Sequence, residues 1–347
     1  MKASFLRLIA YLLIQLIPVV LLNASYNNVE SEAAKTVFSA LWKKQRYLKD
    51  ANDYSLVYFG DSRTLSNFHP DRLDPLLGTR SINLGAIAHW LPTQYPFLRD
   101  IIASIPKSST VVWSIGHQNF SMVGKEITNN YPIAPYRSEY LSWGFTEEQL
   151  KSNLDYYNST ENTLTRRKAW NTWIKQSYSK SVGLASKADI LSSETLLDEA
   201  GSPTSQDIKT KGGGELRVEI NHEFFRKKQL EFSGKFTAEH CLGEEPYLKM
   251  FSEMLTLFRK NDINLIVNEV EEAPTSYADL QSRAACRDYM RRKIQPMVEA
   301  EGFPYIRVDW DRFGAADYFD YNHLNSDGVE KFSPLIAEKI RPYLVKE

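Results

Sequence analysis

Two polar segments near opposite ends of the chain carry the residue types of a nucleophilic active site. Gly60-Asp61-Ser62 follows directly on the apolar run Leu56–Phe59, which places the Ser62 hydroxyl at the end of an expected strand. A serine hydroxyl is a weak nucleophile until a base takes its proton. The three-residue spacing of Asp320 and His323 lets the carboxylate bind one imidazole nitrogen and leaves the other to accept the serine proton. We therefore predict a Ser62–His323–Asp320 catalytic triad, although Gly60-Asp61-Ser62 alone would indicate only a turn that caps a helix.

Acyl transfer also needs hydrogen-bond donors for the oxyanion that develops in the transition state. Gly85 follows a second apolar run, where its backbone N–H is sterically accessible. Gly116–Asn119 follows a third apolar run and offers two side-chain amides. We predict an oxyanion hole built from the N–H groups of Ser62 and Gly85 and the side chain of Asn119 or Gln118.

The elements that must position these residues have the pattern of an alternating α/β domain. Continuous apolar runs indicate strands buried on both faces, as in a parallel sheet. Five such runs occur, at 56–59, 81–84, 111–115, 263–267 and 305–308. Apolar residues at helical spacing lie between them, and a last helix could begin at Ser333 with Pro334 in its first position. We predict a doubly wound, mostly parallel five-stranded sheet that binds ligands at the carboxyl ends of its strands.

The four candidate segments resemble, in chain order, the signature blocks of the SGNH/GDSL hydrolase superfamily. These segments are Gly60-Asp61-Ser62, Gly85, Gly116–Asn119 and Asp320–His323. The resemblance covers residues 52–128 and 246–345 and implies a flavodoxin-like fold and a serine-dependent activity on acyl esters, with no cofactor. Two positions depart from the family pattern. Arg63 replaces the usual leucine, and Gln118 stands in the usual asparagine place, so the amide donor is open between Gln118 and Asn119, with Asn119 favoured by residue type.

The ends of the chain are similar to those of membrane-attached SGNH-like proteins of bacterial envelopes, including alginate O-acetylation proteins. The similar features are an N-terminal anchor, Gly-Asp-Ser-Arg at 60–63, and a His-Leu-Asn-x-x-Gly-x-x-x-Phe-Ser ending at 323–333. This resemblance implies an acylated carbohydrate or another ester as substrate and a membrane protein as acyl donor. Esterase and O-acyltransferase use the same machinery and differ in whether water or a sugar hydroxyl reaches the acyl-enzyme, so both stay open.

Two other functional classes also stay open. A non-catalytic assembly or binding protein of envelope polysaccharide modification could keep the fold, and the altered third block favours it. A metal-dependent hydrolase could use the carboxylates near the last expected strand, Asp309, Asp311, Asp317 and Asp320. Because the sequence has no HExxH pattern and keeps the serine, aspartate and histidine, we predict the acyl-ester enzyme, without a metal.

The N-terminal residues have the pattern of a targeting segment. Lys2 and Arg7 precede a long apolar run, a flank typical of a secretory signal whose basic end stays in the cytoplasm. Ala24 gives a poor cleavage site, so we predict an uncleaved signal anchor over residues 1–24 rather than a cleaved signal peptide. A polar stalk over residues 25–51 would then connect the inner membrane to a catalytic domain on the periplasmic side.

The alternating pattern breaks between residues 129 and 245. We predict that this stretch is an insertion, a lid or substrate platform, in the SGNH-like domain formed by 52–128 and 246–347. Its aromatic side chains could stack on sugar rings or form a small core of their own. They include Tyr131, Tyr136, Tyr140, Trp143, Trp170 and Trp173.

Composition and cysteine content narrow the possibilities further. A chain of 347 residues with 43% hydrophobic residues can bury a sizeable core. A formal net charge of -1 provides no overall field that would attract nucleic acid, so no nucleic-acid partner is expected. The only cysteines are Cys241 and Cys286, and either a disulfide or two reduced thiols is compatible with the sequence. Their spacing fits neither a zinc site nor a CxxC redox pair.

Overall fold

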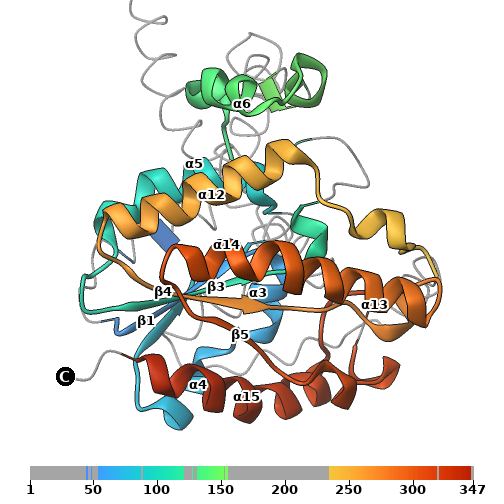
Figure 1. Cartoon of the computed structure of the whole chain (residues 1–347). Helices are drawn as coiled ribbons and strands as arrows, with labels where there is room; N and C mark the ends of the chain where they lie inside the picture. Colours follow the sequence, from blue (N-terminus) through green and yellow to red (C-terminus); the bar gives the residue numbers. More distant parts are fainter. Residues whose placement is uncertain are drawn as a thin grey trace, which may run out of the picture.

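The computed structural model describes a parallel sheet with helices on both faces (Figure 1). The described residues are 44, 45, 48, 54–86, 89–120, 127, 131–151, 153, 154, 234–318 and 320–344. The strands are β1 (Leu56–Gly60), β2 (Ser81–Asn83), β3 (Thr110–Ile115), β4 (Asn264–Glu269) and β5 (Tyr305–Arg307). They pair in the order β2-β1-β3-β4-β5, and every pairing is parallel. The predicted five-stranded parallel sheet is confirmed.

Alternation along the strands explains why the sheet has a core on each face. In β1, Val57 and Phe59 point into one core while Leu56 and Tyr58 point into the other. Every residue of β1 and β3 is buried. Two-sided burial makes such strands read as continuous apolar runs rather than as alternating ones.

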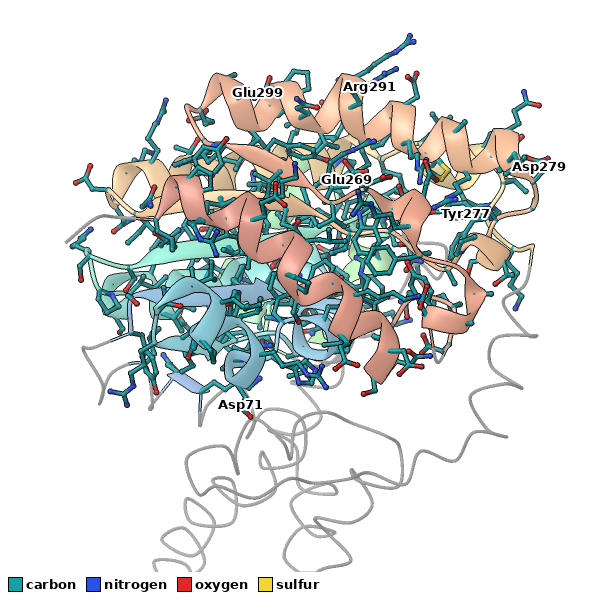
Figure 2. All side chains as sticks on the ribbon, turned by 90° about the horizontal axis from the view of Figure 1, so that it is seen from below. Asp71, Glu269, Tyr277, Asp279, Arg291 and Glu299 are labelled. Atoms are coloured by element: carbon teal, nitrogen blue, oxygen red, sulfur yellow. A yellow bond between two sulfur atoms is a disulfide. The ribbon has the colours of Figure 1, made fainter. Side chains whose placement is uncertain are left out.

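Two sets of helices cover the faces of the sheet. One face packs against α5 (Leu91–Ile101), α12 (Glu245–Lys260) and a continuous helical segment made of α13 (Leu280–Tyr289), a π-turn (Met290–Ile294) and α14 (Gln295–Ala300). The other face packs against α3 (Ser62–Asn67), α4 (Pro70–Leu77) and α15 (Ser326–Ile340). Arg291 and Glu299 project outward from the α13–α14 segment, whereas Glu269 of β4 is enclosed (Figure 2).

Short 3₁₀ helices lie between these elements or after α15. They are Ile102–Ser104, η2 (His117–Asn119), Ala134–Tyr136, η5 (Ala238–Cys241), Pro274–Ser276, Trp310–Arg312, Ala315–Asp317 and Arg341–Tyr343. Of these, η2 follows β3 directly, and η5 precedes α12. Both contribute residues to the sites described below.

The described start of the expected insertion packs on the sheet domain. Helix α6 (Arg137–Trp143) contributes Tyr140, which is fully buried, and Trp143, whose ring lies 4.8 Å from that of Tyr95 in α5. Tyr131 and Tyr136 also pack in or against the same core. These four aromatic residues therefore serve as core, whereas Trp170 and Trp173 lie outside the described residues.

The predicted anchor over residues 1–24 lies outside the described residues. Among the residues that are described, no helix is long and apolar enough to cross a membrane. Of the predicted stalk, Lys44 and Leu48 are buried, and Lys44 Nζ donates a hydrogen bond to the Gly85 carbonyl oxygen (2.8 Å). The end of the stalk therefore packs on the domain rather than standing away from it.

The last helix begins seven residues earlier than the Ser333 start that the sequence suggested. Helix α15 starts at Ser326, where the Asn325 side chain accepts a hydrogen bond from the Gly328 backbone N–H (3.0 Å). This cap satisfies one of the N–H groups that a helix start leaves unpaired. Pro334 lies inside the helix instead of at its first position.

Candidate active site

The turn after β1 presents Ser62 at the start of a helix. Gly60 has φ of +149°, and a Cβ there would lie 2.9 Å from the Ser114 carbonyl oxygen, so a larger residue does not fit. Asp61 caps α3 by accepting a hydrogen bond from the Arg63 backbone N–H (2.9 Å). Ser62 is the first residue of α3, a position whose backbone N–H has no acceptor within the helix.

The structure brings Ser62, His323 and Asp320 into one hydrogen-bonded chain. Ser62 Oγ lies 2.7 Å from His323 Nε2, and His323 Nδ1 lies 2.7 Å from Asp320 Oδ2. Both distances are in the range of strong hydrogen bonds. His323 is partly exposed, with 17% of its side-chain surface accessible, so a substrate can approach the imidazole. This geometry is that of a nucleophile, a base and a group that orients the base.

The Asp320 carboxylate is held in its charged form. Its Oδ1 accepts hydrogen bonds from the backbone N–H groups of Asn322 (2.9 Å) and His323 (2.8 Å). Burial alone would raise the pKa of Asp320, but the nearby His323 imidazole and these hydrogen bonds hold it below its ordinary value. An ionised Asp320 can keep the His323 Nδ1 proton in place while Nε2 exchanges a proton with Ser62.

Two of the expected oxyanion donors already have partners within the protein. The Gly85 N–H donates to the Asn83 side-chain oxygen (2.8 Å). The Asn119 side chain donates through Nδ2 to Asp61 Oδ2 (3.2 Å) and is fully buried. The contacts therefore do not support the preference for Asn119 as the donor. Gly85 packs closely behind Asp61, because a Cβ at Gly85 would lie 2.9 Å from the Asp61 carbonyl oxygen.

Gln118 has a side-chain N–H donor that the described residues do not use. Its Nε2 is buried and has no hydrogen-bond partner in the described part of the chain. Gln118 lies in η2, immediately after β3, and β3 pairs directly with β1. Gln118, rather than Asn119, is therefore the side-chain amide of this segment whose donor is not already bound within the described residues.

A buried charged network lies next to the triad, and sequence reasoning missed it. Arg63 Nη2 donates to Asp61 Oδ2 (2.6 Å) and to Asn119 Oδ1 (2.7 Å), and Arg63 Nη1 donates to Glu272 Oε1 (2.7 Å). Glu272 also accepts from Tyr277 Oη (2.7 Å). Arg63 and Glu272 are fully buried. These contacts give Arg63 a role that leucine could not fill. The position of Glu272 just past β4 is the sequence feature that could have indicated its place at this edge of the sheet.

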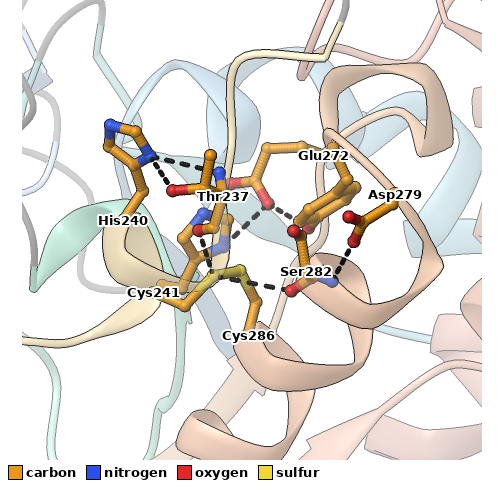
Figure 3. Close-up of a disulfide and its surroundings, with 9 residues drawn as sticks. Thr237, His240, Cys241, Glu272, Asp279, Ser282 and Cys286 are labelled. Atoms are coloured by element: carbon orange, nitrogen blue, oxygen red, sulfur yellow. Dashed lines mark hydrogen bonds and ion pairs between the residues drawn. A yellow bond between two sulfur atoms is a disulfide. The ribbon is translucent and has the colours of Figure 1, made fainter.

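The network also includes a histidine near the only disulfide in the described residues. His117 Nδ1 lies 3.0 Å from Glu272 Oε2. Cys241 of η5 and Cys286 of α13 form a disulfide bond beside Glu272 (Figure 3). The sequence left open whether these two cysteines form a disulfide or stay reduced, and in the structure they form the disulfide.

The carboxylates considered for a metal-dependent hydrolase bind protein cations instead. Asp311 pairs with Arg287 (2.9 Å), Asp309 with Arg312 (3.5 Å) and Asp317 with Lys331 (2.5 Å), while Asp320 pairs with His323. Across the described residues, the one group of three or more His, Cys, Asp or Glu side chains within ligand distance is His117, Cys241 and Cys286. Among the described residues, no three of these carboxylates lie within ligand distance of one another.

A comparison of the chain with known protein families, and another with curated proteins, each finds no match.

Proposed function

We propose that this protein is a serine-dependent acyl-ester enzyme, either a hydrolase or an O-acyltransferase. The observation that carries the proposal is the chain of two 2.7 Å hydrogen bonds from Ser62 through His323 to Asp320. Ser62 comes from the end of β1, and the other two come from the loop before α15. A binding protein would have no need to align all three groups in this order.

The geometry supports a two-step reaction. Ser62 Oγ attacks the ester carbonyl carbon as His323 Nε2 takes the hydroxyl proton, and the imidazolium formed is stabilised by Asp320. The tetrahedral intermediate collapses to an acyl-enzyme, and the leaving alkoxide receives the proton from His323. Water or a sugar hydroxyl then attacks the acyl-enzyme in the same way, which gives hydrolysis or transfer respectively.

Two donors support stabilisation of the oxyanion. The Ser62 N–H lies at the start of α3, just past β1. Gln118, whose Nε2 has no hydrogen-bond partner among the described residues, follows the neighbouring strand β3. Fixed donors of this kind contribute more in a water-poor site than in solution because they need no reorganisation during the reaction. The Gly85 N–H is bound to the Asn83 side chain. Gly85 would instead contribute by its small size, which lets the loop after β2 approach Asp61.

The finer assignment follows the sequence resemblance. The strand order β2-β1-β3-β4-β5 is that of flavodoxin-like sheets, the fold expected for an SGNH/GDSL enzyme. Together with the positively flanked N-terminal segment, it supports a membrane-anchored, periplasmic enzyme that acts on an acylated carbohydrate of the cell envelope. Residues 129–245 would then provide a lid or substrate platform.

Ester turnover by the full-length chain tests the proposal. We expect hydrolysis of a short-chain aryl acetate by the wild type and at least a roughly 10³-fold lower kcat in Ser62→Ala, since the nucleophile is lost. The control is Ser142→Ala, which removes an exposed hydroxyl from α6 and should leave turnover unchanged. Equal turnover in Ser62→Ala and wild type would remove Ser62 from the nucleophile's role.

A non-catalytic envelope-assembly protein is the second candidate. It is favoured by the engagement of the Gly85 N–H and of the Asn119 side chain within the protein, which leaves fewer donors for an oxyanion than the family pattern implies. A folded wild type that turns over no ester, even with an acyl-donor membrane fraction present, would make this candidate the better one.

A further inference from the structure

The disulfide lies beside a histidine that has an unused ring nitrogen. One ring nitrogen of His117 and the sulfur atoms of Cys241 and Cys286 all lie within 4.8 Å of one another. His117 Nδ1 is taken by Glu272, and Nε2 is buried with no hydrogen-bond partner in the described part of the chain. His117 is 3% exposed and both cysteines are at most 2% exposed. A buried ring nitrogen without a partner in the described residues, on a ring that lies close to two sulfurs, requires a physical explanation.

We propose that the reduced form of this cluster is a binding site for a borderline-soft divalent cation of the zinc class. The ligands are His117 Nε2 and the thiolates of Cys241 and Cys286. Zinc takes Cys sulfur at about 2.3 Å and His nitrogen at about 2.0–2.1 Å, so two ligand atoms of a tetrahedral site lie roughly 3.5–3.8 Å apart. The three ligand atoms lie within 4.8 Å of one another, so the side chains must adjust by about 1 Å when the ion binds. The proposal is independent of the acyl-ester activity.

Glu272 gives His117 the orientation that a metal ligand needs. Histidine ligands of zinc usually donate their other ring N–H to a carboxylate, which fixes the tautomer and raises the basicity of the ligating nitrogen. Here Nδ1 faces Glu272 Oε2 at 3.0 Å, so the lone pair of the neutral ring lies on Nε2. Glu272 is itself held by Arg63 and Tyr277. The outer shell of a metal site is therefore already built.

The remaining surroundings are compatible with a cation. The carbonyl oxygens of Thr237 and Ser282 lie 3.4 and 3.7 Å from the Cys241 sulfur and could complete a fourth position as neutral donors. Two thiolates balance the charge of a divalent ion, so the buried site gains no uncompensated charge. The aromatic rings of Phe236 and Tyr277 pack against His117 and restrict water access.

The disulfide and the metal site are alternative states of the same two sulfurs. A dithiol reductant transfers two electrons and two protons to the Cys241–Cys286 bond and is itself oxidised to a cyclic disulfide. The cation then displaces the two thiol protons as it binds. Spacing rules missed this site because its three ligands come from three separate elements, η2, η5 and α13.

Cobalt(II) binding to the full-length chain tests the proposal, with Co²⁺ as a spectroscopic substitute for zinc. After reduction by a dithiol and its anaerobic removal, we expect one Co²⁺ per chain, with thiolate charge-transfer absorption and tetrahedral visible bands. The oxidised chain should show neither. His117→Gln keeps a donor for Glu272 but loses the ligand, and it should weaken binding at least about tenfold. The control His69→Gln changes a half-buried histidine at the N-cap of α4 on the other face of the sheet, and it should bind as wild type.

Three results would overturn the proposal. The first is a reduced wild type that binds no more Co²⁺ than the Cys241→Ser/Cys286→Ser variant. The second is unchanged affinity in His117→Gln. The third needs no variant: X-ray absorption of the zinc-loaded, reduced wild type with no sulfur ligands, where the proposal expects two sulfurs and one imidazole.

Discussion

Replacing Arg63 with leucine removes the guanidinium that the described residues contribute to the buried network beside the triad. Arg63 is fully buried and pairs with Asp61 (2.6 Å) and Glu272 (2.7 Å). Leucine removes the guanidinium from both carboxylates and leaves Glu272 with His117 (3.0 Å) and Tyr277 as partners. It also leaves Asn119 Oδ1 without one of its donors. The protein must then keep buried charges unpaired or take up protons, and either outcome costs stability.

The expected loss is about 3–5 kcal/mol in the free energy of unfolding, the usual cost of removing one partner from a buried ion pair. The effect should be at the upper end of that range because a single guanidinium serves two carboxylates. A loss of this size is a large fraction of the stability of a typical domain, which is about 5–15 kcal/mol.

Urea unfolding of the full-length chain, followed by tryptophan fluorescence, measures the change as a lower midpoint at constant slope. The matched control is Arg291→Leu. Arg291 pairs with Asp288 at the surface, with side chains 62% and 37% exposed. Exposed pairs of this kind contribute at most about 1 kcal/mol, so the control midpoint should change little.

A loss below about 1 kcal/mol in Arg63→Leu would refute the view that this network is held by the guanidinium. A partial rescue is also expected. Combining Arg63→Leu with Asp61→Asn and Glu272→Gln removes the stranded charges and should recover part of the lost stability. Further destabilisation in the triple variant would contradict it.

Three other predictions concern single side chains. Asp320→Asn should lower kcat for ester hydrolysis roughly 10⁴-fold, since the imidazole loses its orienting carboxylate; steady-state kinetics with less than a tenfold change would contradict this role. Gln118→Ala should lower kcat about 10²–10³-fold with little change in KM, and an unchanged kcat would place the oxyanion donor elsewhere. Burial raises the pKa of Glu269 to about 7. In the unfolded chain Glu269 ionises near pH 4.5, so the free energy of unfolding should decrease by on the order of 3 kcal/mol as the pH rises from 4.5 to about 7. Glu269→Gln should make the free energy of unfolding, measured with urea at each pH, depend less on pH in this range. The same pH dependence in Glu269→Gln and wild type would refute the prediction.

The sheet and the positions of the triad residues could be predicted because both depend on local patterns. Two-sided burial gave β1, β3 and β4 continuous apolar runs, and parallel strands bring their carboxyl ends to one edge. Ser62 therefore had to lie near that edge, and the spacing of Asp320 and His323 indicated their contact. The start of α15 was predicted at Ser333 because Pro334 favours a first-turn position. The helix actually starts after its cap, Asn325, about two turns before Pro334.

The network and the cysteine–histidine cluster could not be predicted because their members meet only in the folded chain. Asn119 was favoured by residue type, yet its carboxamide binds Asp61 and Arg63. Glu272 and Arg63 are 209 residues apart in sequence, and neither residue alone indicates the other as its partner. Contacts between strand-end loops depend on side-chain direction, which periodicity does not determine.

Covalent labelling of the full-length chain by a fluorophosphonate, with the adduct located by peptide mass spectrometry, tests the central claim most directly. The probe reacts with serines whose hydroxyl is activated by a base. The proposed triad predicts one adduct, on Ser62, which is lost in His323→Ala and kept in Ser142→Ala. A folded wild type with no adduct, or with the adduct on another serine, would contradict the account.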